Sequence, residues 1–137
     1  MNKSPDRFLI IDDDPISNHI CAMYIDLVFP GAFVESLTSP AKALEHIEEA
    51  FRQHRREETV MLLDINMPVM SGWDLLEIFA GFSPELKKLY KIYILSSSVA
   101  DEDKELAASN PLVSGFIEKP LDSDRLEEIF GDVNAHD

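Results

Sequence analysis

The chain has 137 residues, of which 45% are hydrophobic, and this composition is typical of one globular domain with a hydrophobic core. Its formal net charge of −14 disfavours binding to nucleic acid or to an anionic membrane, because both surfaces are negative, and leaves room for a cation. No apolar run is long enough for a signal peptide or a membrane span, and the single cysteine, Cys21, excludes an internal disulfide and favours a reducing, cytoplasmic setting.

Along the chain, short apolar runs alternate with segments in which apolar residues recur at helical spacing. The runs of strand length are residues 8–11, 32–37, 60–63, 92–95 and 115–117. The segments of helical period are residues 15–28, 40–51, 73–79, 101–109 and 122–130. Asp14-Pro15 and Ser39-Pro40 are typical helix starts, with a capping side chain followed by proline. Residues 81–88 are expected to form an irregular connection with one helical turn after Ser83-Pro84.

This alternation predicts the fold class and the domain organisation. Continuous apolar strands that are separated by helices form parallel sheets covered on both faces, so we expect an α/β domain built from five strand–helix units. No linker or repeat interrupts the pattern, which predicts a single domain over residues 1–137 with its core at about residues 8–130. The last helix is expected to end about seven residues before the C-terminus, which leaves no room for an output domain.

Candidate functional side chains follow four of the five predicted strands, whereas the second ends in Leu37-Thr38-Ser39, which carries nothing comparable. They are Asp12, Asp13 and Asp14 after the first strand, Asp64 and Asn66 after the third, Ser96, Ser97 and Ser98 after the fourth, and Lys119 after the fifth. Each has an ordinary structural explanation, as a helix cap, a turn residue or a surface lysine. Function collects at the carboxyl ends of the strands in an open parallel sheet, however, and the order acid, acid, hydroxyl, amine indicates a site there.

The three acids predict a metal site. Asp12, Asp13 and Asp64 would converge if the first and third strands are neighbours. Two unit charges about 4 Å apart interact by roughly 4 kcal/mol at an effective dielectric of about 20. Three such carboxylates therefore need a cation, or some of them must take up protons. Oxygen ligands favour Mg²⁺, for which Mn²⁺ could substitute, and the absence of histidine near these strand ends in the sequence argues against zinc.

Taken together, these motifs resemble one family. The segments Asp12-Asp13-Asp14-Pro15, Leu63-Asp64-Ile65-Asn66-Met67-Pro68 with Ser71-Gly72, Leu95-Ser96-Ser97 and Lys119-Pro120 are similar to the receiver domains of bacterial two-component response regulators. The resemblance covers about residues 8–130 and implies a flavodoxin-like, doubly wound (βα)5 fold, with a five-stranded parallel sheet of order 2-1-3-4-5 and helices on both faces.

The resemblance also implies roles for individual residues. Asp64 resembles the phospho-accepting aspartate, and Asp12 and Asp13 resemble the acid pair that holds Mg²⁺, with Asp13 as the expected direct ligand. Asp64 itself and the backbone carbonyl of Asn66 would complete the protein ligands of the metal. Lys119 resembles the lysine that pairs with the phosphoryl group.

Three further expectations concern the conformational switch. Ser96 resembles the switch hydroxyl; counting back from Lys119 without a gap selects Ser97 instead, but Ser96 directly follows the apolar strand and is preferred. Phe116 resembles the aromatic residue whose inward or outward position reports the state of the domain. The bond between Lys119 and Pro120 is expected to be cis, as the family implies.

The resemblance predicts a phosphorylation-dependent signalling switch of a two-component system or phosphorelay. Its phosphodonor would be a sensor histidine kinase or a histidine phosphotransfer protein, and its output would be binding to an unknown downstream protein. The domain would catalyse only its own phosphotransfer and dephosphorylation. One alternative is a degenerate receiver that binds proteins independently of phosphorylation. A Mg²⁺-dependent phosphatase with an aspartate nucleophile is disfavoured, because Asn66 stands where such an enzyme carries a second aspartate as general acid.

Overall fold

The chain forms one parallel sheet covered by helices on both faces, as described by a computed structural model of residues 5–97 and 100–131. The strands are β1 (Arg7–Ile11), β2 (Phe33–Leu37), β3 (Thr59–Asp64), β4 (Tyr90–Ser96) and β5 (Val113–Glu118). All pairings are parallel, and the strands lie in the order β2-β1-β3-β4-β5. The predicted flavodoxin-like fold class and its strand order are therefore confirmed.

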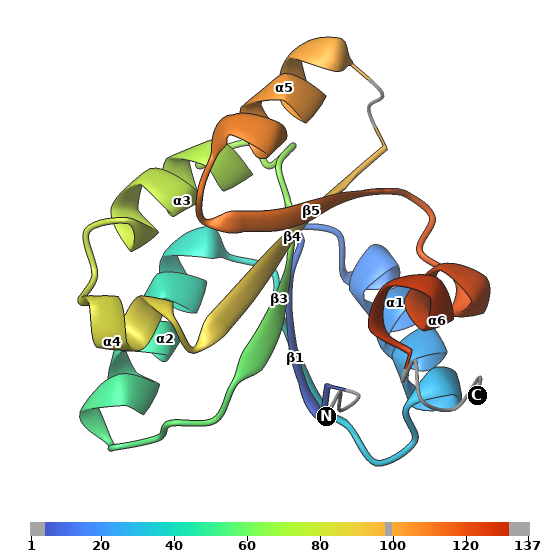
Figure 1. The fold of residues 1–137 in the computed structure, drawn as a ribbon, viewed down its shortest axis with the longest axis horizontal. Helices are drawn as coiled ribbons and strands as arrows, with labels where there is room; N and C mark the ends of the chain where they lie inside the picture. Colours follow the sequence, from blue (N-terminus) through green and yellow to red (C-terminus); the bar gives the residue numbers. More distant parts are fainter. Residues whose placement is uncertain (1–4, 98–99, 132–137) are drawn as a thin grey trace.

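The helices divide into two layers, one on each face of the sheet (Figure 1). One face carries α1 (Pro15–Val28) and α6 (Ser123–Phe130), and the other carries α2 (Pro40–Arg52), α3 (Gly72–Phe79), α4 (Pro84–Lys87) and α5 (Asp101–Ser109). The helical turn expected after Ser83-Pro84 is α4. No helix within the described residues is long and apolar enough to span a membrane.

Alternation along the strands fills both layers of the core. In β3, Met61 and Leu63 point into the cluster beneath α2 to α5, whereas Val60 and Leu62 point into the cluster beneath α1 and α6. Because both faces of the central strands β1 and β3 are buried, these two strands need apolar residues at nearly every position, which explains their continuous apolar runs in the sequence. Cys21 is buried in the α1 layer, and its burial together with the nearby charge of Asp12 raises the pKa of its thiol to about 12.

The topology brings the ends of β1 and β3 together. The connection after β1 leads outward to β2, and the chain then crosses to the other side of β1 to form β3, so the direction of winding reverses between β1 and β3. Ile11 and Leu63 are paired across this junction. The residues that follow them, Asp12 and Asp64, therefore lie side by side at the topological switch point, where open α/β sheets place their ligands.

The start of α3 is packed tightly against the end of β3. The amide of Gly72 donates a hydrogen bond of 3.2 Å to the carbonyl oxygen of Ile65. A Cβ atom at Gly72 would lie 2.7 Å from the carbonyl oxygen of Asp64 and 2.8 Å from the Cα atom of Ile65. Both neighbours are backbone atoms, so they cannot move aside without displacing the strand end, and glycine is required at this position.

We predict that Gly72→Ala destabilises the fold, because the added methyl group overlaps backbone atoms, a kind of overpacking that costs about 1–3 kcal/mol. Gly31→Ala is the matched control, since nothing lies within 4 Å of a Cβ atom there. Urea unfolding of both variants measures the difference in free energy. Equal stabilities for the two variants would show that the end of β3 can yield to the extra atom.

Candidate functional site

Three carboxylates meet at the carboxyl edge of the sheet. Asp12 and Asp13 directly follow β1, and Asp64 is the last residue of β3. Each of the three offers an oxygen atom, and these atoms lie within 4.8 Å of one another. Asp12 and Asp64 are buried, at 1% and 5% exposure, whereas Asp13 is exposed. Like charges are thus concentrated where water is largely excluded, which costs free energy unless positive charge is supplied.

Part of that positive charge comes from Lys119, at the end of β5. Its ammonium group lies 2.7 Å from Oδ2 of Asp12 and 3.9 Å from Oδ2 of Asp64. Lys119 is held in place by its backbone, because its amide donates a 2.9 Å hydrogen bond to the carbonyl oxygen of Ser96. The peptide bond between Lys119 and Pro120 is cis.

The two buried carboxylates differ in their electrostatic environment. Burial raises the pKa of Asp12, but hydrogen bonds from the Lys119 ammonium, the Asp14 amide and the Ser17 hydroxyl outweigh it, and the pKa is lowered overall. Burial also raises the pKa of Asp64, and there it prevails over the hydrogen bond from the Asn66 amide and the charge of Lys119. Asp12 is therefore the tighter partner of Lys119, and Asp64 is the more basic carboxylate.

Asn66 links Asp64 to the end of β4. Its backbone amide donates a 3.2 Å hydrogen bond to Oδ1 of Asp64, and its side-chain amide donates a 3.3 Å hydrogen bond to the hydroxyl of Ser96. Ser96 is fully buried as the last residue of β4, whereas Ser97 is exposed beyond the strand and Ser98 lies outside the described residues. Of the two candidate serines, the structure places Ser96 against Asn66.

Phe116 lies in β5, three residues before Lys119. It is half-buried, pairs in register with Ile94 of β4, and packs against the core cluster beneath α2 to α5. The register between β4 and β5 shifts by one residue at Ser114, since Val113 pairs with Ile92 and Gly115 with Tyr93. Beyond this shift, the end of β5 aligns with the end of β4.

Asn18 is not among the site residues predicted from the sequence, but it supports the acid cluster. Its side-chain amide donates a 3.0 Å hydrogen bond to the backbone carbonyl of Asp12, and the residue is 3% exposed. The buried residues of α1 are Asn18, Cys21 and Ile25, which share one face of the helix. An asparagine on an otherwise apolar helix face was the signal available in the sequence, because a buried amide needs a hydrogen-bond partner.

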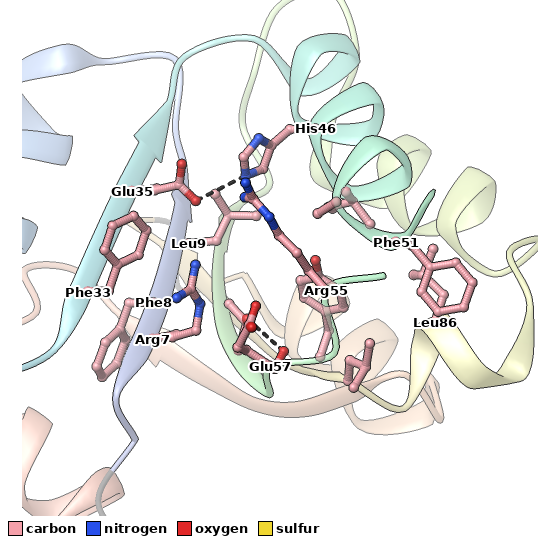
Figure 2. A pocket seen from close by; sticks show the side chains of 15 residues that line it. Arg7, Phe8, Leu9, Phe33, Glu35, His46, Phe51, Arg55, Glu57 and Leu86 are labelled. Carbon is pink, nitrogen blue, oxygen red and sulfur yellow. Dashed lines mark hydrogen bonds and ion pairs between the residues drawn. The ribbon is translucent and has the colours of Figure 1, made fainter. Parts of the chain in front are cut away.

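A hollow at the opposite edge of the sheet is a poor alternative site. Figure 2 shows polar and charged side chains around it, among them Arg7, Glu35, His46 and Arg55, with His46 and Glu35 joined by a 3.0 Å contact. Its volume of about 30 Å³ has room for little more than one or two water molecules. It lies at the amino ends of β1, β2 and β3, away from the acid cluster.

The donor set at the carboxyl edge fits Mg²⁺. Asp12, Asp13 and Asp64 offer only carboxylate oxygens, and Mg²⁺ in proteins is bound by a few such ligands together with water. Within the described residues, no other group of three or more histidine, cysteine or acidic residues is placed to hold a metal ion. The part expected for the backbone carbonyl of Asn66 stays a prediction.

Known proteins match this chain along most of its length, and not only at the site. The sensor kinase/phosphatase LuxN of Vibrio harveyi is 29% identical over 130 residues, which are 95% of this chain but only 14% of LuxN. The two-component response regulator ORR1 of Oryza sativa subsp. japonica is 27% identical over 128 residues, or 90% of this chain and 53% of ORR1. The chain thus spans only part of the length of these relatives.

Solved structures share the whole fold. A two-component response regulator from Cytophaga hutchinsonii has a TM-score of 0.84 and 28% identity, covering 97% of this chain and 99% of that one. A response regulator receiver protein from Dyadobacter fermentans has a TM-score of 0.77 at 23% identity, over 90% and 93% of the two chains, which shows the common fold. Because the family model of the response regulator receiver domain matches residues 8–130, nearly the entire folded region, the chain belongs to the response regulator receiver domain family.

Proposed function

We propose that the chain is a phosphorylation-dependent signalling switch of a two-component system or phosphorelay, with Asp64 as the residue that takes up the phosphoryl group. Family membership supports phosphorylation-dependent signalling in general. The observation that carries the assignment to Asp64 is its position: a buried carboxylate at the end of β3, with two further acids and the Lys119 ammonium close to it. We place this activity in the cytoplasm, because a reduced, buried Cys21 suits that compartment.

In the proposed reaction, a carboxylate oxygen of Asp64 attacks the phosphorus atom of a phosphohistidine. The new oxygen–phosphorus bond makes an acyl phosphate, and the bond from phosphorus to the donor's imidazole nitrogen breaks. Lys119 offsets the negative charge of the transferred group, since its ammonium lies only 3.9 Å from Oδ2 of Asp64. When bound by Asp12, Asp13, Asp64 and the Asn66 carbonyl, Mg²⁺ supplies further positive charge, and Mn²⁺ could substitute for it.

The same residues connect phosphorylation to a change of conformation. In the structure, the Ser96 hydroxyl accepts a hydrogen bond from Asn66, and Lys119 is bound to Asp12. Binding of phosphoryl oxygens by Ser96 and Lys119 requires that these contacts be exchanged for new ones. The ends of β4 and β5 then shift, and Phe116 in β5 reports the change. The difference in contacts between the two arrangements determines how far the population moves.

The exposed face of α1 is a suitable docking surface for the phosphodonor, a sensor histidine kinase or a histidine phosphotransfer protein. This ridge consists of Ile16, Ile20, Met23 and Leu27, which are 69%, 41%, 48% and 67% exposed. Their spacing of four, three and four residues aligns them along one side of the helix. Next to the ridge, a largely apolar groove of about 220 Å³ extends to Lys119 and Pro120. An apolar surface that leads to Lys119, the lysine beside Asp64, favours a protein partner over a small donor.

We predict that incubation with acetyl phosphate and Mg²⁺ adds one phosphoryl group to the wild type and none to Asp64→Asn, because the amide cannot act as the nucleophile. Asp26→Asn is the matched control, since Asp26 is exposed on α1 and away from the acid cluster. Intact-protein mass spectrometry measures the uptake. An unlabelled wild type, under conditions that label another receiver domain, would favour the alternative of a phosphorylation-independent binding module.

We predict that Mg²⁺ stabilises the fold and that Asp13→Asn loses most of this effect. A ligand present at ten times its dissociation constant raises the free energy of unfolding by about 1.4 kcal/mol. Without the metal, Asp13→Asn should be at least as stable as the wild type, because one of three like charges is removed. Thermal unfolding with and without MgCl₂ tests both statements, and a Mg²⁺ effect that persists in Asp13→Asn would remove Asp13 from the ligand set.

We predict that Ile20→Glu slows phosphotransfer tenfold or more, because the loss of one central apolar contact costs about 1–2 kcal/mol. The donor in this assay is a phosphorylated histidine protein that labels the wild type. Labelling by acetyl phosphate should be unchanged in this variant. Ile78→Glu on α3 is the control, because Ile78 is similarly exposed, at 46%, and lies on the other face of the sheet. Equal transfer rates for Ile20→Glu and Ile78→Glu would show that the donor docks elsewhere.

A further inference from the structure

Helix α5 is held less firmly than its neighbours. Its N-cap, Ala100, makes no side-chain capping hydrogen bond, whereas α1, α2, α3, α4 and α6 each begin with a capping side chain. Only one of its nine residues, Ala107, is buried, and Leu106 is 47% exposed. A segment with so little burial can change position at low cost in free energy.

One polar contact joins α5 to α3. The indole Nε1 of Trp73 donates a 3.2 Å hydrogen bond to Oδ1 of Asp103, and the two residues are 30 positions apart in the sequence. Asp103 lies in the first turn of α5, and Trp73 is the second residue of α3. Both helices lie on the same face of the sheet, as Figure 1 shows.

The Trp73 end of this contact is fixed to the phosphorylation site. Trp73 follows Gly72, whose amide is hydrogen-bonded to the Ile65 carbonyl and which lies so close to the backbone of Asp64 that an added Cβ atom would overlap it. The Trp73 ring also packs against the core cluster. The donor of the hydrogen bond is therefore anchored to the strand end that carries Asp64.

The Asp103 end belongs to the part of the fold that the switch must move. In the sequence, α5 connects β4, which ends at Ser96, to β5, which is followed by Lys119. In the arrangement that the structure describes, Ser96 is bonded to Asn66 and Lys119 to Asp12. The hydrogen bond between Trp73 and Asp103 thus joins the start of α3, which is anchored to the end of β3, to α5, which can move.

We propose that the hydrogen bond between Trp73 and Asp103 is a tether that holds α5 in the arrangement in which Ser96 and Lys119 keep these contacts. Loss of the tether and phosphorylation then favour the same alternative position of α5. This inference rests on the proposed function, because it assigns a regulatory contact to the same site. It makes Asp103 a positioning residue, which acts through α5 and not on the phosphoryl group.

The test compares two acids in the same turn of α5. Asp103→Ala removes the acceptor of the tether, and Glu102→Ala removes the same charge from the same helix end, so that any effect on the helix dipole is matched. Asp103→Asn keeps an oxygen acceptor, and Trp73→Phe removes the donor but keeps an aromatic ring. Two quantities are measured in each protein: amide hydrogen exchange of residues 104–109, and the initial rate of labelling by acetyl phosphate with Mg²⁺.

We expect Asp103→Ala and Trp73→Phe to speed both amide exchange and labelling by about fivefold, the effect of one net hydrogen bond. Glu102→Ala and Asp103→Asn should stay within about twofold of the wild type, because each keeps most of the tether's energy. The chain has one tryptophan, so its emission should also change in Asp103→Ala.

Equal effects of Asp103→Ala and Glu102→Ala would overturn the proposal, because charge at the helix end would then explain them. Faster exchange without faster labelling would overturn it as well, since the contact would be structural only. In both cases the wild type is labelled. A wild type that takes no label would instead refute the proposed function, and the regulatory role of the tether with it.

Discussion

The ion pair between Lys119 and Asp12 is the interaction on which the site depends. It joins residues 107 positions apart over 2.7 Å, and it ties the end of β5 to the end of β1 across the intervening ends of β3 and β4. Asp12 is a nearly inaccessible carboxylate beside a second buried one, Asp64, and such an arrangement is costly without a compensating cation. The ion pair lowers the free-energy cost of burying these carboxylates. Lys119 stays bound to Asp12 unless another negatively charged group competes for its ammonium.

The fold places these charges where they can act together. Winding reverses between β1 and β3, so Asp12 and Asp64 lie side by side, while Gly72 lets α3 begin directly against the Asp64 backbone. Two features keep the acceptor side rigid: the buried Asn18, which holds the Asp12 carbonyl, and the tight start of α3. On the other side, α5 buries only one of its nine residues, Ala107. A switch requires a rigid phosphoryl acceptor, here Asp64, next to elements that can move when the phosphoryl group is bound.

Much of this could be predicted from the sequence, because the strands are continuous apolar runs and the acids, serines and lysine stand at their carboxyl ends. The strand pattern predicts the sheet, and the sheet topology then predicts that Asp12, Asp13 and Asp64 converge. The choice between Ser96 and Ser97 could not be settled in the same way, since it depends on where β4 ends and on the register shift at Ser114. The hydrogen bonds of Asn18 and of Trp73 with Asp103 join distant segments through side-chain geometry, which apolar periodicity does not contain.

The most direct test of the account is to locate the phosphoryl group chemically. The wild type is incubated with acetyl phosphate and Mg²⁺ and treated with sodium borohydride, which reduces an aspartyl phosphate to homoserine, and the peptides are sequenced by tandem mass spectrometry. We predict homoserine at position 64 and unchanged aspartate at positions 12 and 13. Homoserine at position 12 or 13, or its absence throughout the peptides of a protein that carries the phosphoryl mass, would contradict the assignment of Asp64 as the acceptor.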